Sequence, residues 1–414
     1  MPLGLYISVP FCRTKCSYCN FASNVFSKSA YGKYVARLEE DIAGSLEPVA
    51  QLGCRFDEAV DSIYLGGGTP SILEAAHLRR IFTAIRNHFA VTLDAEITVE
   101  CAPGTLTPDL IETLLRCGVN RVSLGVQSFI EEEARSVGRL HNRSIVLEEI
   151  GRLREAGIAN LNIDLIAGLP HQTRESWAFS VSEAIATGVP HVSIYMLEVD
   201  EDSRLGSELI AGGSRYHAHF VPDDDLMAEF YQEACEMLGS CGIEQYEISN
   251  FARQAVQAPP DGFPTYASRH NLKYWTRQPY LGFGVDAHSM LVGDPRSSQV
   301  NRAVRFATAD SLDAFMNGAP KSLTPVSPHA AIEESFFLGL RLNRGVDLPL
   351  LQTEWKMCSP EAIAFWESAI RQCVEEGTLE QKNATLRLTP RGRLLSNEVF
   401  ARFLVDETKW EAVT

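Results

Sequence analysis

Segments with strand-like and helix-like patterns alternate through the first half of the chain, and this order admits few architectures. Six runs rich in apolar and β-branched residues lie at 3–10, 62–65, 96–100, 121–126, 160–166 and 191–197. Segments with helical apolar spacing lie between them, at 31–46, 110–117, 145–156 and 174–187. Strands that alternate with helices form a parallel sheet with helical crossovers. The number of units suits an incomplete α/β barrel or an open doubly wound sheet, and periodicity does not separate the two.

The pattern changes after residue 200. Asp223 is expected to cap a helix that runs to about Leu238. Strand-like runs follow at 246–249 and 280–290, and two or three helices from residue 328 precede a hairpin at 379–388 and a last helix from Pro390. Since 414 residues exceed the roughly 250–300 that one core serves, we expect several regions. They are a core at 1–225, a connecting α+β region at 226–327, and a winged-helix-like module at 328–414.

The charge of the chain excludes one class of partner. A net charge of −16 argues against binding to a nucleic-acid backbone, which needs clustered Lys and Arg. No apolar run reaches the roughly 18 residues that cross a membrane, so no span is predicted. The first residues lack a basic leader with a cleavage site, which predicts a cytoplasmic protein whose ten cysteines are thiols or metal ligands.

Cys12, Cys16 and Cys19 form a C-x3-C-x2-C cluster directly after the first predicted strand. Three thiolates on one loop can bind three irons of a [4Fe-4S] cubane and leave the fourth iron open for chemistry. The alternatives are a zinc site or a redox pair. Zinc favours a fourth Cys or His at short spacing, but the next cysteine is Cys54 and the first histidine is His77.

The segment Cys-Arg-Thr-Lys-Cys-Ser-Tyr-Cys-Asn-Phe resembles the signature of radical S-adenosylmethionine (SAM) enzymes. The resemblance implies a [4Fe-4S] cluster whose open iron binds SAM, an electron donor for that cluster, and a partial (β/α)6 barrel. It thereby decides the α/β architecture that periodicity left open.

Polar and glycine residues follow the predicted strands, where ligands of parallel sheets gather. Gly66-Gly67-Gly68-Thr69-Pro70 follows the second strand; it resembles the family's GGGTP loop, although alone it could be an ordinary turn. Within the superfamily the chain is most similar to the HemN/HemW group. That resemblance implies SAM-binding positions at Tyr6, Tyr18, Gly67, Gly68, Thr69, Glu100, Gln127, Arg139, Asp164, Met196 and His288.

Two features separate the branches of this group. The dehydrogenase branch, which decarboxylates coproporphyrinogen III, has a fourth cysteine after the triad and an N-terminal extension, whereas here Asn20 and Phe21 follow Cys19. The segment His270-Asn-Leu-Lys-Tyr-Trp275 resembles the H-N-x-x-Y-W motif of the HemW branch, whose members bind heme and deliver it to apoproteins such as respiratory cytochromes. The resemblance therefore favours a heme chaperone over the dehydrogenase, and whether the chain is an enzyme is left undecided.

His270 is a candidate heme ligand because an imidazole beside Tyr and Trp could supply an axial nitrogen and an aromatic wall. The alternative is a packed loop in which this histidine forms local hydrogen bonds. The loop at 253–268, which contains Pro259-Pro260, is longer than the family's usual connection and could alter a partner surface. His217 and His219 form an H-x-H pair, which is more often a loop feature than a metal site.

Overall fold

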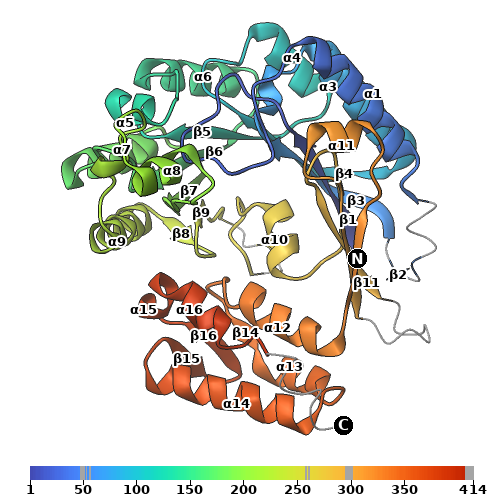
Figure 1. Ribbon diagram of the computed structural model, residues 1–414, viewed down its shortest axis with the longest axis vertical. Helices are drawn as coiled ribbons and strands as arrows, with labels where there is room; N and C mark the ends of the chain where they lie inside the picture. Colours follow the sequence, from blue (N-terminus) through green and yellow to red (C-terminus); the bar gives the residue numbers. More distant parts are fainter. Residues whose placement is uncertain are drawn as a thin grey trace.

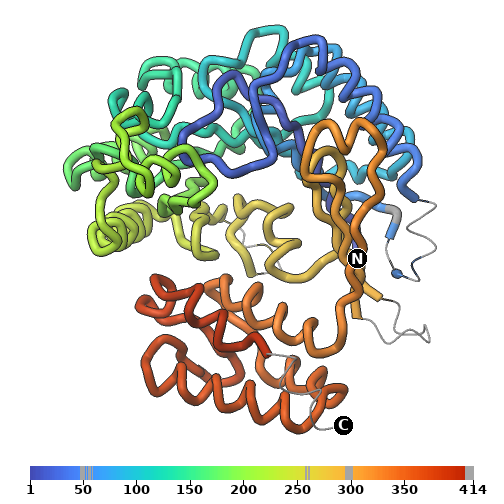
Figure 2. The backbone as a smooth tube through the Cα atoms, viewed as in Figure 1, coloured from blue at the N-terminus to red at the C-terminus, as the bar shows by residue number. Residues whose placement is uncertain are grey.

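The computed structural model describes residues 1–46, 52, 54, 55, 57–256, 259, 262–293 and 302–405 (Figures 1 and 2). The predicted alternation is confirmed, because six strands pair in parallel in the order β1-β3-β4-β5-β6-β7. Their bounds are β1 Pro2–Val9, β3 Asp57–Gly67, β4 Ala90–Cys101, β5 Arg121–Gln127, β6 Asn160–Ala167 and β7 His191–Met196. All six expected strands are present, although β3 and β4 extend well beyond their predicted ranges.

Helices cover the outer face of this sheet (Figure 1). Side-chain caps mark several of their starts: Thr107 accepts from the backbone N–H of Leu110, and Asn142 does the same for Ile145. The crossover helices are α1 Ser29–Ala43, α3 Ala75–His88, α4 Pro108–Arg116, α5 Glu131–Ser136, α6 Arg143–Glu155 and α7 Arg174–Ala186, with a 3-10 turn η1 at Pro70–Ile72. Their apolar faces and the strands share one large core.

The middle region of the chain extends the same sheet at both edges. At one edge β9 and then β8 pair antiparallel beyond β7, and at the other β10 pairs parallel with β1 and is followed by antiparallel β11, β12 and β13. The path of paired strands in the described residues ends at β8 and β13, so the barrel is incomplete. These elements are α8 Arg204–Ala211, η2 Ala218–Phe220, α9 Asp224–Ser240, β8 Ile243–Gln245, β9 Asn250–Arg253, α10 Arg269–Trp275, β10 Tyr280–Phe283, β11 His288–Gly293, β12 Ala303–Ala307, α11 Leu312–Met316 and β13 Ser322–Val326; β2 Cys54–Arg55 pairs with β11.

Two strand predictions in this region are corrected. Residues 246–249 are the turn between β8 and β9, where local hydrogen bonds replace strand pairing. The run at 280–290 is two antiparallel strands, because Gly284 and Asp286 adopt positive φ and turn the chain between them. The predicted cap at Asp223 is confirmed. The Pro260 part of the 253–268 loop lies outside the described residues.

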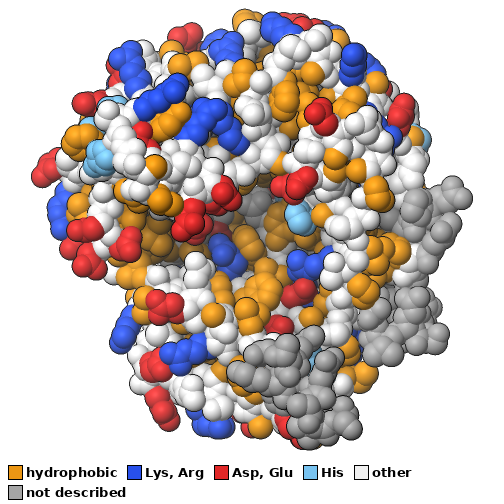
Figure 3. All heavy atoms as spheres, viewed as in Figure 1, with side chains coloured by type: hydrophobic (Ala, Val, Ile, Leu, Met, Phe, Trp, Pro, Cys, Tyr) orange, Lys and Arg blue, Asp and Glu red, His pale blue; other side chains and the backbone are white. Residues whose placement is uncertain are grey.

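The C-terminal region has its own small core and the helix and strand order of a winged helix. Its elements are α12 Pro328–Gly339, β14 Val346–Asp347, α13 Leu348–Trp355, α14 Pro360–Glu375, β15 Leu379–Lys382, β16 Thr385–Leu388, α15 Pro390–Leu394 and α16 Ser396–Ala401. Glu334 of α12 joins this region to the rest of the chain by ion pairs with Arg277 and Arg305. Figure 3 shows a hollow between the two parts, with apolar and charged side chains on its walls.

Among the helices described, none is long and apolar enough to cross a bilayer.

Candidate functional site

The cysteine loop follows β1 and is closed by backbone hydrogen bonds. Cys12 N–H donates to the carbonyl of Asn24 at 3.0 Å, and Asn24 N–H donates to that of Pro10 at 2.9 Å. Ser17 N–H donates to the carbonyl of Val137, which ties the loop to the end of α5. Cys12 is buried, whereas Cys16 and Cys19 are half-buried. The loop is therefore held in one shape, with one thiol buried and two partly open to solvent.

The glycine loop after β3 packs directly against Cys12. The backbone N–H groups of Gly68 and Thr69 donate to the carbonyls of Val9 and Phe11, and Thr69 Oγ1 lies 3.8 Å from Cys12 Sγ. A Cβ at position 68 would stand 2.6 Å from the carbonyl oxygen of Phe11 and 3.0 Å from Cys12 Sγ. Gly67 has φ of 99°. Only glycine fits this close approach, which is more than an ordinary turn requires.

The donor set of this loop fits a [4Fe-4S] cluster. Each cubane ligand binds a separate iron, so the thiols need not converge on one point, and no group of three or more His, Cys, Asp or Glu in the described part of the chain is arranged around a single ion. Burial raises the pKa of Cys12, as do the neighbouring Cys16 and Cys19, so a metal must displace its proton. Burial alone would lower the pKa of Arg139, but Tyr18, Cys16 and Asp164 raise it, so this guanidinium stays charged beside the thiols.

A cavity of about 380 Å³ opens beside the loop and brings together five predicted SAM positions, namely Tyr6, Gly67, Gly68, Glu100 and His288. Its wall also includes residues that we did not assign from sequence: Ser8, Phe21, Ala22, Ser23, Tyr274, Tyr280, Val285 and Asp286. Of these, Tyr274 belongs to the H-N-x-x-Y-W motif and Phe21 lies two residues after Cys19, so motif proximity could have indicated both. Ser8 lies on β1 itself, and Ala22 and Ser23 lie on the cysteine loop. Tyr280, Val285 and Asp286 come from β10 and the turn after it, which only the fold brings next to β1.

Glu100 is the acidic group of this cavity. Tyr64 Oη donates to its Oε1 at 2.7 Å. Burial raises the pKa of Glu100 to about 7, and nearby Asp164 adds to the shift. A carboxylate that is costly to ionise when alone is stabilised by a bound cation, so Glu100 suits the positively charged amino or sulfonium group of SAM.

Gln127, Arg139 and Asp164 lie next to each other at the ends of β5 and β6. A register shift between Gly125 and Gln127 opposite β6 marks a bulge, and Gln127 has φ of 70°, a strained value for a non-glycine residue. A Cβ at Gly125 would meet Arg139 Nη2 at 2.6 Å and Gln127 Nε2 at 3.2 Å. Gln127 Oε1 and Arg139 Nε are buried without a partner among the described residues. These free polar atoms are consistent with a ligand at this edge.

Tyr18 and Met196 have less direct links to the cavity. Tyr18 lies between the second and third cysteines and packs against a small apolar cluster that includes Leu205 and Ala218. Met196 ends β7 and packs against the main core. Both stay predictions as SAM contacts.

His270 is fully enclosed at the start of α10. Its Nδ1 is 3.1 Å from Ser62 Oγ, and its Nε2 is 2.8 Å from Tyr274 Oη. Its backbone N–H donates to Glu96. Burial lowers its pKa to about 3, so the ring is neutral. In this conformation both ring nitrogens form hydrogen bonds within the protein, as in the packed alternative.

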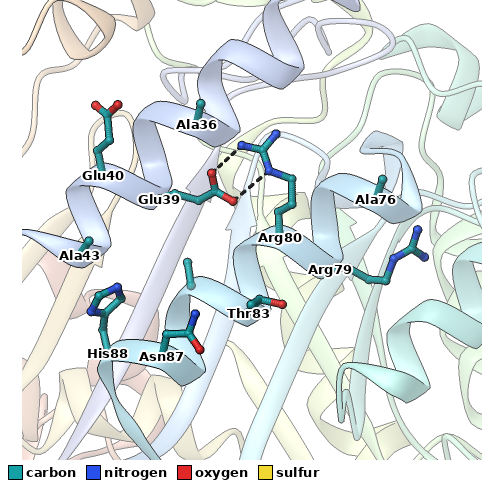
Figure 4. Close-up of a pocket in the computed structure, with 11 residues that line it drawn as sticks. Ala36, Glu39, Glu40, Ala43, Ala76, Arg79, Arg80, Thr83, Asn87 and His88 are labelled. Carbon is teal, nitrogen blue, oxygen red and sulfur yellow. Dashed lines mark hydrogen bonds and ion pairs between the residues drawn. The ribbon is translucent and has the colours of Figure 1, made fainter.

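The larger cavity, of about 660 Å³, lies outside the barrel between α1 and α3, away from the cysteines. Alanines such as Ala36 and Ala76 line it, and Arg80 reaches across to Glu39 with a two-point ion pair (Figure 4). It holds none of the predicted site residues.

An incomplete parallel barrel with a three-cysteine loop after its first strand and a glycine loop after the second defines the radical SAM class. Residues 6–182 match the radical SAM superfamily, and residues 326–395 match the HemN C-terminal domain. Heme chaperone HemW of Lactococcus lactis subsp. lactis is 32% identical over 98% of both chains. HemW of Bacillus subtilis is 30% identical and covers 96% of this chain and 98% of its own. The chain therefore belongs to the HemW family.

One solved structure supports the fold over nearly the whole chain. Coproporphyrinogen III oxidase HemN from Escherichia coli, described as a radical SAM enzyme, aligns with a TM-score of 0.78 over 97% of this chain and 90% of its own. The two sequences are 22% identical, so this similarity shows the fold alone.

Proposed function

We propose that this chain is a heme chaperone, which binds a [4Fe-4S] cluster and SAM, takes up heme and transfers it to an apoprotein such as a respiratory cytochrome. The observation that carries the proposal is the 32% identity to a heme chaperone over 98% of both chains. Similarity of that extent includes the barrel, the middle strands and the C-terminal region together, and not the cysteine motif alone.

The residues of the site have distinct roles in this proposal. Cys12, Cys16 and Cys19 would hold the cluster, which when bound can supply an electron for cleavage of the SAM sulfonium. Glu100 would pair with a positive group of SAM, while Gly67 and Gly68 allow the ligand to approach the backbone. An electron donor and a reducing, cytoplasmic compartment belong to the same proposal.

The rival function is oxidative decarboxylation of coproporphyrinogen III to protoporphyrinogen IX. Phe21 stands where that branch has its fourth cysteine; its side chain is 63% exposed at the edge of the cavity and offers no metal ligand. The position thus lacks the chemistry of the dehydrogenase motif.

Two assays on the same anaerobically reconstituted protein test the proposal. In the first, coproporphyrinogen III, SAM and a strong reductant are supplied, with a known dehydrogenase as the positive control; we expect no product. In the second, hemin-loaded protein is mixed with an apocytochrome, and we expect the absorption spectrum of the holocytochrome to appear faster than with free hemin. Multiple-turnover decarboxylation would replace the chaperone with the dehydrogenase, and failure to bind hemin would reject the chaperone.

A further inference from the structure

Two histidines meet at the rim of the barrel, and neither belongs to the lining of the SAM cavity. His171 lies in the turn between β6 and α7, and His217 lies between α8 and η2; the region is marked by α7 and α8 in Figure 1. His171 Nε2 is 3.1 Å from His217 Nδ1, and the ring centroids are 4.9 Å apart. Both rings are half-buried, so each keeps a side open to solvent.

The surrounding backbone fixes the orientation of this pair. His171 and His217 have φ of 70° and 61°, a region that side-chain-bearing residues seldom adopt. His171 N–H donates to the carbonyl of Phe220 at 3.0 Å. The carboxylate of Glu208 accepts from the N–H groups of Tyr216 and Ala218, on either side of His217. The loop around His217 is therefore held by backbone hydrogen bonds at Tyr216, Ala218 and Phe220.

The hydrogen bond between the rings leaves a nitrogen ready to bind metal. In a neutral pair one ring donates N–H and the other accepts, so the donor ring has its lone pair on its other nitrogen. With His217 Nδ1 as donor, that nitrogen is His217 Nε2, which points away from its own backbone. No hydrogen bond from the described residues occupies it. A metal-binding histidine usually donates its other ring N–H to an acceptor that fixes its tautomer, and His171 Nε2 takes that place here.

His191 and His270 have fixed rings but no free nitrogen, and His141, which has one nitrogen bonded to the carbonyl of Val126, is buried. His191 has Nδ1 bonded to Asn162 and Nε2 bonded to Tyr246, and His270 likewise has both nitrogens bonded. Both of these rings are fully buried. His217 combines a fixed ring with a free outer nitrogen and partial exposure.

The surface around His217 suits a flat, apolar anion. Phe220 is 55% exposed, and its ring stacks on His171 with centroids 4.2 Å apart. Leu209 and Ile210, on the helix whose Glu208 holds the His217 loop, are 53% and 67% exposed. The neighbouring Arg215 is exposed and lies over the Tyr216 ring. Apolar rings and side chains offer contact to a porphyrin, and a guanidinium offers a partner for a propionate carboxylate.

We propose that Nε2 of His217 is an axial ligand for the iron of heme, with His171 as the positioning residue, Phe220 as an apolar contact and Arg215 as a propionate partner. The inference rests on the proposed function, because heme is the cargo of the chaperone. An axial ligand on an open surface suits a protein that must release its cargo, since dissociation does not require the core to open.

The site is also connected to the cysteine loop. The N–H of Leu205 in α8 donates to the carbonyl of Ser17 at 2.9 Å, and Arg204 Nη1 donates to that of Lys15. Tyr216 and Tyr18 pack against the same small apolar cluster. The helix that supports the heme loop therefore contacts the loop that would hold the cluster.

The test is hemin titration of the full-length, cluster-loaded chain, followed by difference absorption spectra and by EPR of the ferric heme. His217→Asn is the main variant, because asparagine tolerates positive φ and lacks an imidazole. His219→Asn is the matched control, since His219 is exposed on the same loop and lies beside Glu208. We expect His217→Asn to weaken hemin binding at least tenfold and to remove the histidine-ligated EPR signal, while His219→Asn matches the parent.

Two further variants separate ligation from folding. His217→Tyr should retain binding with the charge-transfer absorption of a tyrosinate-ligated ferric heme, a signature that a structural role would not produce. His171→Ala should weaken binding less than His217→Asn and broaden the EPR signal, because the ligand ring is no longer oriented. Unchanged affinity and unchanged signal in His217→Asn would overturn the inference while leaving the chaperone function intact. No hemin binding by the parent chain would reject the function itself.

Discussion

The cysteine loop with its cavity and helix α10 with its H-N-x-x-Y-W motif are both conspicuous in the sequence, but most of their polar side chains differ in hydrogen bonding. Within α10, only Trp275 Nε1 is buried without a hydrogen-bond partner among the described residues. Beside the cysteine loop, Gln127 Oε1 and Arg139 Nε are buried without partners among the described residues. In α10, both ring nitrogens of His270 are hydrogen-bonded, and Lys273 Nζ pairs with Asp61 and with the carbonyl of Pro2. Buried polar groups are normally satisfied, so unsatisfied ones call for an explanation.

This difference teaches that a motif can belong to a site or to its scaffold. The first region keeps donors and acceptors free for ligands. Helix α10 instead fastens β1 and β3, through Lys273 and His270, beneath the cavity that Tyr274 lines. We expect changes in the first region to abolish ligand content and changes in α10 to reduce stability.

The largest effect is expected from replacement of Cys12, Cys16 and Cys19 by Ala together. Iron and sulfide content should fall from about four each per chain to near zero, because no other thiolates are placed to replace them. Cys241→Ala, at an exposed cysteine, is the control and should keep full content. Retention of the cluster in the triple variant would refute the site assignment.

His270→Ala should lower the free energy of unfolding by about 2–4 kcal/mol, because it leaves a cavity and removes the hydrogen-bond partner of the Ser62 and Tyr274 hydroxyls. Urea unfolding measures this loss, with exposed His88→Ala as the control. Hemin affinity at native conditions should stay within about threefold of the parent, an energy difference below 1 kcal/mol. A stable variant that has lost hemin binding would reverse the comparison and make α10 part of the heme site.

The burial of His270 also predicts how the stability of the chain depends on pH. Burial lowers the pKa of His270 to about 3, below its unfolded value near 6.5, so the unfolded chain takes up this proton first. The stability that depends on a neutral His270 is fully present above pH 6.5 and is lost as the pH falls toward 3. Between pH 7 and pH 5, the free energy of unfolding should fall by about 2 kcal/mol because of this group.

Unfolding in urea at pH 5 and pH 7, for the parent and for His270→Asn, isolates this contribution. His141 and His191 also have lowered pKa values through burial, but they are present in both proteins and cancel. If the free energy of unfolding fell equally in the parent and the variant between the two pH values, His270 would not be sealed from solvent.

The smallest effect is expected from Asn20→Ala. Asn20 Nδ2 donates to Asp200 Oδ2 at 3.0 Å on the surface, which links the cysteine loop to the segment before α8. Its loss should change stability by less than about 1 kcal/mol and leave iron content unchanged. A marked loss of cluster would show that the loop depends on this outer contact rather than on its own backbone bonds.

The sequence by itself determined the alternation of strands and helices, the three-cysteine loop after the first strand, the glycine loop and the family, because each depends on residues close together in the chain. Caps, turns and motif spacing are local and leave direct marks in sequence. Tertiary structure decided the rest: the turn at 246–249 and the split of 280–290, the edge strands that join the first sheet, and the bulge that turns Gln127. It also decided the different bonding of His270 and His217, since whether an imidazole nitrogen is free depends on residues such as Ser62 and His171, which are distant in sequence and brought near only by packing.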